Sequence, residues 1–397
     1  MTQRLYYTDS HLTTFTGTVT EQVEVQGRAA VVLDRTAFYP TSGGQPFDTG
    51  TLDEVRVEEV IDLDDGRIAH VMAAPLLTGA EVTGRIDWTR RFDHMQQHTG
   101  QHVLSAAFDR VHGARTESFH LGTDVSTIDF GTTVSTEGIT AAEQEANRVI
   151  WEDRPLHVRF VSEEEAASLP LRKEPARGGT LRLIEVDGFD LSACGGTHVS
   201  RTGAIGVIAV TSFERFKGGT RLEFVCGGRA LARFRQQRDV IASVVRHLSV
   251  LPGELPGAIE RLQDAVTAQK QVARGLQQRL VRHEADWLAA RASALAGVRL
   301  VSETVEGWDA QGLKALASDI ASRPAHAAVL LTPDTPPLIV IARASDLAMD
   351  AGRILKELIA QFGGKGGGRP ELAQGGGLAA DHAGILAAAR ALVEGRG

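Results

Sequence analysis

The sequence predicts an α+β protein that is built from several domains. Its 397 residues, 43% of them hydrophobic and 23% charged, are enough for two or three hydrophobic cores. The first 90 residues alternate apolar and polar positions as β-strands do, whereas later segments carry the three- and four-residue spacing of helices. Because no stretch of about 18 uncharged apolar residues is present, no membrane span is predicted.

Residues 1–90 are predicted to form a small β-barrel-like domain. Short alternating runs such as GTVTEQVEVQGRAAVVLD and AEVTGRIDWT are separated by turns rich in Gly and Asp. The loop TAFYPTSGGQPFDTG, residues 36–50, contains the pair Gly43 and Gly44, which would let the backbone approach a small ligand closely. An ordinary turn explains the same residues equally well.

Residues 91–228 are predicted to form an α+β domain. A helical pattern runs from Trp88 to about Val111, and a second helix is expected near residues 140–151. The strand-like runs of this domain are VSTIDF, LHVRFV, TLRLIEV, AIGVIAVTSF and TRLEFVC.

Residues 229–297 are predicted to form a helical hairpin arm. The segment LPGELPG, residues 251–257, breaks the helical pattern, and a second long helix is expected to start near Ala258. Apolar residues recur along that helix at spacings of three, four and seven, with interruptions at Gln269 and His283. A hairpin that packs on itself or on a partner is therefore favoured over a long coiled coil.

Residues 298–397 are predicted to form a compact α/β domain that contains the glycine-rich run GGKGGGRPELAQGGG. A phosphate-binding loop of the GxxxxGK type is excluded, because no Ser or Thr follows the lysine. The run is instead expected to form a flexible or tightly turning surface loop. Its backbone N–H groups, together with Lys365 and Arg369, would still suit a phosphate.

The charge of the chain is unevenly distributed. The net charge is -8, which argues against a uniformly basic nucleic-acid binder, but residues 229–299 carry a net charge of +6. Such a basic segment suits RNA, although a solvated Arg-rich helix has the same composition. The N-terminus lacks the apolar core of a secretion signal, so a cytoplasmic protein is predicted.

Histidines spaced four residues apart indicate a metal site. In DHMQQHTGQHVLSAAF, the pairs His94/His98 and His98/His102 each lie one helical turn apart, so that two imidazoles can reach one ion. A polar helix face explains one such pair more simply, and two ligands leave a tetrahedral zinc half filled. In FDLSACGGTHVSRTGAIG, Cys194 and His198 are again four apart, on a glycine turn that can aim both side chains at one point.

The two cysteines are expected to have different roles. With only two in the chain, a disulfide framework is excluded. Cys194 has a histidine close by in the sequence. A role as a metal ligand is therefore favoured over a role as a buried thiol for this residue. Cys226 has no histidine near it in the sequence and is expected to be a small core residue.

The motifs HTGQH and CGGTH, preceded by FYPTSGGQPFDTG, resemble the editing domain of alanyl-tRNA synthetase and its free-standing relatives, the AlaX trans-editing proteins. The resemblance covers the whole chain. It implies an N-terminal β-barrel-like domain, an α+β zinc-binding editing domain, a helical hairpin arm and a C-terminal α/β DHHA1-like domain, also called C-Ala. It further implies one bound zinc ion (Zn2+), with His94 outside the ligand set. The implied ligands are His98, His102, Cys194 and His198.

The resemblance also implies an activity. Proteins of this kind are hydrolases that cleave the ester of Ser-tRNA(Ala) or Gly-tRNA(Ala), which arise because a synthetase pocket sized for alanine rejects glycine and serine poorly. The aminoacylation half of the synthetase is not expected, because the chain begins at the β-domain. The arm and the terminal domain would bind tRNA(Ala), and a homodimer through the C-terminal region is compatible with the resemblance.

Two groups of residues are candidates for selectivity and catalysis. Polar groups of the glycine-rich loop could pair with the hydroxyl of a seryl substrate, which an alanyl substrate lacks. These loop residues are Thr41, Ser42, Gly43, Gly44 and Gln45. The group that accepts a proton from the attacking water is unassigned, with Ser118 and His120 as candidates. Ser118 stands where many synthetase editing domains carry glutamine, and a structural hydrogen bond is the simpler role for His120.

Two other functions are compatible with parts of the sequence. Four protein ligands close a tetrahedral zinc shell, which favours a non-catalytic, zinc-stabilised RNA-binding protein. The glycine-rich TSGGQ loop argues against that alternative. A short-oligonucleotide phosphoesterase would share a DHHA1-type domain, but the Asp- and His-rich metal motifs of that class, such as DHH, are absent from the sequence.

Overall fold

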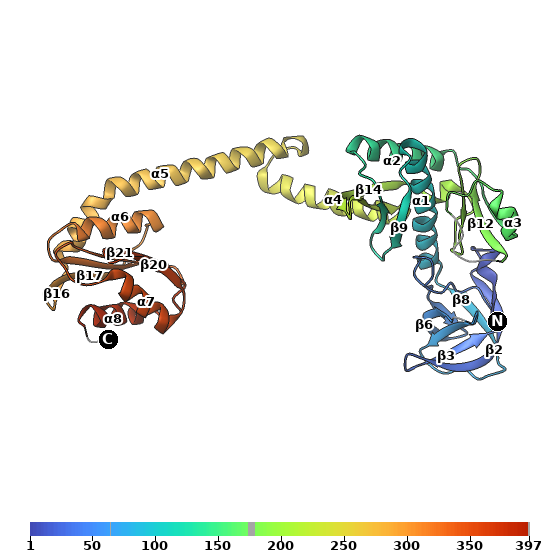
Figure 1. Cartoon of the computed structure of the whole chain (residues 1–397), viewed down its shortest axis with the longest axis horizontal. Coiled ribbons are helices and arrows are strands. Elements are labelled where there is room, and N and C mark those ends of the chain that lie inside the picture. Colours follow the sequence, from blue (N-terminus) through green and yellow to red (C-terminus); the bar gives the residue numbers. More distant parts are fainter. Residues whose placement is uncertain (64, 174–178, 396–397) are drawn as a thin grey trace. The chain divides into compact units, whose positions relative to one another are not determined.

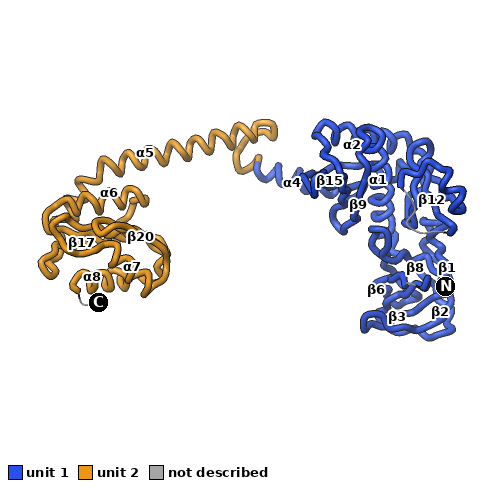
Figure 2. Tube along the Cα trace, viewed as in Figure 1, with its two compact units in different colours: residues 1–244 blue, residues 245–397 orange. Residues whose placement is uncertain are grey.

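The computed structural model describes residues 1–63, 65–173 and 179–395. It consists of two compact units, Met1–Val244 and Val245–Gly397 (Figure 2). Both units contain helices and strands (Figure 1), so the predicted α+β class is confirmed. The four-domain division remains a prediction, and residues 396–397 of the last predicted domain lie outside the described part.

The first unit contains a closed, six-stranded antiparallel barrel, as the alternating pattern predicted. In spatial order its strands are β2 (Thr14–Val25), β3 (Arg28–Leu33), β7 (Ile68–Met72), β6 (Val55–Asp62), β5 (Gly50–Leu52) and β8 (Glu81–Ile86). Inward-facing side chains such as Phe15, Leu33 and Ile68 fill the interior. A short parallel pair, β1 (Gln3–Arg4) and β4 (Arg35–Thr36), leads to the loop with the TSGGQ segment.

Helix α1 (Trp88–His112) is buried along most of its length. The side chain of Asp87 caps its start by accepting a hydrogen bond from the backbone N–H of Arg90. Gly113 ends the helix in the left-handed conformation, with φ 63°. The helix that carries the three spaced histidines therefore forms where the sequence predicts it.

A four-stranded antiparallel sheet and helix α2 (Thr136–Trp151) pack against α1 around one hydrophobic core. The strands, in spatial order, are β14 (Ile208–Phe216), β15 (Gly219–Cys226), β10 (Ser126–Phe130) and β9 (Thr116–Leu121). Cys226 is buried in this core, as predicted. Strand β9 was not predicted, because most of its residues are exposed or only partly buried and show no clear alternation.

A smaller three-stranded sheet positions the second ligand motif. Its strands are β11 (Leu156–Val161), β12 (Leu181–Val186) and β13 (Asp190–Ala193), and the short helix α3 (Glu163–Ala167) follows β11. Because β13 ends at Ala193, the CGGTH segment leaves the sheet at that point.

Two long helices occupy the region of the predicted arm. Helix α4 (Gly227–Leu248) and helix α5 (Leu255–Ala290) form on either side of the LPGELPG break. Helix α5 starts three residues earlier than expected. Pro256 lies in its first turn, where a backbone N–H would have no hydrogen-bond partner within the helix, so the missing N–H of proline loses no hydrogen bond. Packing of these helices as a hairpin remains a prediction. No helix within the described ranges is long and apolar enough to cross a membrane.

The second unit contains a six-stranded mixed sheet with helices on both faces (Figure 1). Its strands, in spatial order, are β16 (Ser293–Leu295), β17 (Val298–Thr304), β18 (His326–Leu331), β19 (Leu338–Arg343), β21 (Leu372–Gly376) and β20 (Lys365–Arg369). The C-terminal end of α5 and helix α6 (Ala310–Ala321) share one core with the sheet. Helices α7 (Ala351–Phe362) and α8 (His382–Val393) share another, formed from the alternate strand residues.

The glycine-rich run of this unit is a β-hairpin, so the predicted flexible or turning loop was wrong. Strands β20 and β21 form the edge of the sheet, and helix α7 packs on them. A Cβ added to Gly366 would lie 2.6 Å from the carbonyl oxygen of Gln374 and 3.1 Å from Cδ2 of Leu355. Glycine is needed here because the strands and the helix approach too closely for side chains.

Candidate metal centre and pocket

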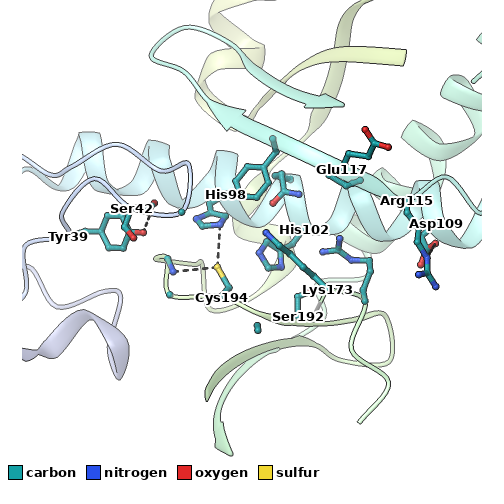
Figure 3. Close-up of a pocket in the computed structure, with 18 residues that line it drawn as sticks. Tyr39, Ser42, His98, His102, Asp109, Arg115, Glu117, Lys173, Ser192 and Cys194 are labelled. Atoms are coloured by element: carbon teal, nitrogen blue, oxygen red, sulfur yellow. Dashed lines mark hydrogen bonds and ion pairs between the residues drawn. The ribbon is translucent and has the colours of Figure 1, made fainter. Parts of the chain in front are cut away.

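Two segments remote in sequence meet beside α1. On that helix, His98 and His102 lie one turn apart on the same face. The segment after β13 brings Cys194 and His198 against them (Figure 3 shows His98, His102 and Cys194). The nearest ligand atoms of the four residues all lie within 4.8 Å of one another. Within the described ranges this is the one group of such residues that could hold a metal ion.

A glycine and a buried arginine allow the segment with Cys194 and His198 to lie close to α1. A Cβ on Gly196 would lie 2.1 Å from Cε1 of His98, so only glycine permits this approach. The buried guanidinium of Arg182 on β12 donates from Nη1 to the carbonyl oxygens of Cys194, at 2.7 Å, and of Gly196, at 3.0 Å. These contacts hold the Cys194 sulfur 3.4 Å from Nε2 of His98 and 3.3 Å from Nε2 of His198.

Hydrogen bonds to the other ring nitrogens aim the imidazoles. His98 Nδ1 donates to Oε1 of Gln45 at 2.7 Å, and His102 Nδ1 donates to Oδ2 of Asp190 at 3.1 Å. Because amide and carboxylate oxygens of this kind can only accept, Nδ1 carries the proton and Nε2 keeps its free electron pair. This arrangement is typical of metal-binding histidines. The donor set of one thiolate and three imidazoles fits zinc.

The electrostatics of the cluster favour a thiolate. Burial by itself would raise the pKa of Cys194, but the adjacent imidazoles of His98, His102 and His198 stabilise the thiolate and hold the pKa well below its usual range. Burial lowers the pKa of His198 to about 3, which keeps that ring neutral. A deprotonated sulfur and a neutral imidazole are the forms that bind metal.

A cavity of about 190 Å³ lies beside the cluster. His98, His102 and Cys194 form part of its wall (Figure 3). The other residues on the wall are Tyr39, Ser42, Gly43, Gln101, Asp109, Arg115, Thr116, Glu117, Phe119, Arg172, Lys173, Ser192, Ala193, Gly195 and Gly196. The cavity therefore combines a metal-type cluster with both acidic and basic side chains.

The glycine-rich loop reaches this cavity only in part. Ser42 and Gly43 line it, whereas Thr41 is exposed and does not. Gly44, with φ 81°, lies against the ring of Phe119, where an added Cβ would be 2.9 Å from Cε2.

Gln45 is fully buried behind the cluster, and its amide is already engaged. Its Oε1 accepts from His98 and from the backbone N–H of Thr197, and its Nε2 donates to the Thr197 hydroxyl. Gln45 therefore orients a histidine, and selectivity by the other residues of the loop stays a prediction.

The catalytic candidates Ser118 and His120 lie on β9 and do not line the cavity. The Ser118 hydroxyl donates to Oδ2 of Asp129 on the neighbouring strand at 2.7 Å. Their neighbours Glu117 and Phe119 do line it. Alternation along the strand explains the difference, since adjacent residues point to opposite faces.

His94 and several unpredicted residues complete the surroundings. His94 is buried one turn before His98 and is not part of the cluster. Asp190 and Gln101 were not predicted. Asp190 gives no sequence signal, because its partner His102 is 88 residues away. Gln101 lies within the HTGQH motif itself, and that position was its only signal.

Replacement of Gln45 by leucine is expected to weaken zinc binding about 10- to 100-fold, because His98 loses the acceptor that fixes its ring. The zinc dissociation constant can be measured by competition with a chelator. The exposed barrel residue Gln22 provides a matched control, and Gln22→Leu should bind zinc like the original chain. Unchanged affinity in Gln45→Leu would show that the ring is held by other contacts.

The fold and the site together define a multidomain protein with a metal-type ligand cluster beside a small cavity. Three family models match the chain. They are the class II (A) tRNA synthetases over residues 2–90, the threonyl and alanyl tRNA synthetase second additional domain over residues 181–223, and the DHHA1 domain over residues 297–395.

Curated relatives match nearly the whole chain. The alanyl-tRNA editing protein AlaX-L of Pyrococcus horikoshii is 30% identical over 389 residues, which cover 94% of each protein. The alanine-tRNA ligase of Pyrococcus abyssi is 32% identical over 94% of this chain, which spans 42% of that enzyme. The chain belongs to the AlaX-type alanyl-tRNA editing family. A solved C-Ala domain from Aquifex aeolicus alanyl-tRNA synthetase is 21% identical, with a TM-score of 0.25, and covers 26% of this chain and 97% of that domain.

Proposed function

We propose that this chain hydrolyses the aminoacyl ester of tRNA(Ala) that carries serine or glycine. The observation that carries the proposal is the cluster of His98, His102, Cys194 and His198 at the wall of a small cavity. Membership of the AlaX-type editing family supports it. The alternative function, a zinc-stabilised RNA-binding protein without catalysis, is not favoured. A cavity lined by polar groups lies directly beside the cluster, as a substrate site would require.

A zinc ion held by these four residues would supply a positive charge that polarises the ester carbonyl or orients the tRNA terminus. The cavity is small enough to enclose an amino-acid side chain and to limit access of bulk water. Asp109 and Glu117 are the acidic residues that line it, but their carboxylates lie away from the cluster (Figure 3). The group that accepts a proton from the attacking water therefore stays unassigned.

The basic side chains suit the anionic end of a tRNA. Arg115 and Lys173 line the cavity, and Arg115 is 85% exposed. Both side chains are exposed and could approach phosphates of the 3′ terminus, although Arg115 also lies 3.9 Å from Asp109 and the Lys173 ammonium lies 5.4 Å from the centre of the Phe119 ring. The second unit, with its DHHA1 match, and the basic segment 229–299 are proposed to bind the body of tRNA(Ala). A homodimer through the C-terminal region and a cytoplasmic location remain predictions.

Zinc-loaded protein tested with Ser-tRNA(Ala), Gly-tRNA(Ala) and Ala-tRNA(Ala) is expected to deacylate the first two rapidly and the last slowly. The release of labelled amino acid gives kcat/KM for each substrate. Ser-tRNA(Ser) serves as a control for recognition of the tRNA body and should be a poor substrate. Equal hydrolysis of the three tRNA(Ala) esters would reject the editing function.

A further inference from the structure

Gln101 carries a buried acceptor that has no partner. Its side chain lies on α1 between His98 and His102, lines the cavity and is only 2% exposed. Its Oε1 meets no hydrogen-bond donor within the described residues. Several other buried side-chain polar atoms in the described residues also have no partner, but none of them belongs to a residue that lines the cavity. Buried polar atoms are nearly always paired, so an unpaired acceptor on a cavity wall is open to a hydrogen-bond donor that enters the cavity.

The other end of the Gln101 amide is fixed. Its Nε2 donates to the hydroxyl oxygen of Ser105, one turn further along the helix, at 2.8 Å. Ser105 Oγ also accepts from the hydroxyl of Thr116 on β9, at 2.7 Å. These two hydrogen bonds hold the amide nitrogen away from the cavity. The carbonyl oxygen is therefore the end that remains for a ligand.

We infer that Gln101 Oε1 accepts a hydrogen bond from the hydroxyl of the seryl group and thereby sets the preference for the seryl over the alanyl group. The inference rests on the proposed deacylase function and assigns a residue to its choice of substrate. An alanyl group has no donor at this point, so its binding would enclose the carbonyl oxygen without a partner. Gln45, the glutamine predicted for this role, is already bonded to His98 and Thr197.

The substrate ammonium is a poorer match for this oxygen. Seryl, glycyl and alanyl esters all carry that ammonium, so pairing with it would not distinguish them. The carboxylates of Asp109 and Glu117 on the same wall are stronger partners for a cation than a neutral carbonyl is. The seryl hydroxyl is the donor that differs between the substrates.

The test measures binding and hydrolysis separately in the full zinc-loaded chain. Calorimetry gives the affinities for 3′-deoxyadenosine that carries serine, glycine or alanine through a stable 3′-amide, and deacylation gives kcat/KM for the three aminoacyl-tRNAs. The variants are Gln101→Met, which keeps the length but removes the acceptor, and Ser105→Ala, which frees the amide. Gln144→Met, on the exposed face of α2, is the matched control. Zinc content and melting temperature show whether each variant is intact.

In Gln101→Met the preference for the seryl over the alanyl analogue should fall about tenfold, as should the ratio of kcat/KM for the seryl and alanyl esters. Ser105→Ala should show a smaller change in the same direction, and Gln144→Met none. A Gln101→Met preference that is unchanged, an equal loss for all three ligands, or no seryl preference in the original chain would overturn the inference. Seryl-selective binding without hydrolysis would retain it and reject the deacylase function. Rapid hydrolysis by the original chain, together with an unchanged seryl preference in Gln101→Met, would retain the deacylase function and reject the role of Gln101.

Discussion

Loss of the Cys194 thiolate is expected to remove most of the bound zinc and to lower Ser-tRNA(Ala) hydrolysis by at least about tenfold. Removal of an outer-shell partner already weakens metal binding about 10- to 100-fold, so removal of a ligand should cost at least as much. Cys194 supplies the one sulfur of the cluster and the negative charge that balances the cation. Cys194→Ala therefore tests the ligand set directly.

The second cysteine provides the matched control. Cys226 is buried in the core of the same unit, and burial raises the pKa of its thiol, so it stays protonated. Cys226→Ala should lose some stability but keep its zinc and its activity. Mass spectrometry of metals gives the zinc content per chain of both variants, and deacylation assays give their rates. Full zinc occupancy in Cys194→Ala would show that the ion is bound elsewhere.

Replacement of Arg91 by leucine is expected to destabilise the first unit by about 3–5 kcal/mol. Arg91 and Asp48 are both fully buried, and Arg91 Nε lies 3.0 Å from each carboxylate oxygen. The guanidinium also donates to the backbone carbonyl oxygens of Ser10, at 2.8 Å, and Ala37. Leucine would leave the Asp48 charge and both carbonyl oxygens without these partners. The loop that carries Gln45 would lose one of its links to α1, while the hydrogen bond between Gln45 and His98 would remain.

The free energy of unfolding, measured by urea titration, checks this expectation. Arg148 pairs with Glu145 and Glu152 on the surface of α2, and such exposed pairs contribute about 1 kcal/mol or less. Arg148→Leu is therefore the control. An Arg91→Leu variant no less stable than Arg148→Leu would mean that the pair contributes nothing net.

The elements with regular spacing were predictable from the sequence. Alternation predicted the barrel, and the three- and four-residue spacing predicted α1, because these patterns arise from side-chain direction within one element. The glycine-rich hairpin was not predictable in this way. Its strands exist because β19 and helix α7 pack against them, and glycine itself has little preference for a strand.

The site was predictable where it depends on local spacing. Cys194 and His198, four residues apart, lie together as the motif indicated. The outer contacts were not predictable, because Gln45 lies 53 residues before His98 and Asp190 lies 88 residues after His102. The direction in which each β9 side chain points depends on how the strand pairs with its neighbour. Ser118 and Glu117 are adjacent and point to opposite faces, so only Glu117 lines the cavity.

The order of the site segments along the chain sets the order of assembly during translation. The glycine-rich loop and α1 leave the ribosome first, and Cys194 follows about ninety residues later. A nascent chain that ends before this point can fold its barrel but presents His98 and His102 without their sulfur partner. The metal-type cluster is therefore completed only when about half of the chain has been made, after the small sheet has brought Cys194 to the helix.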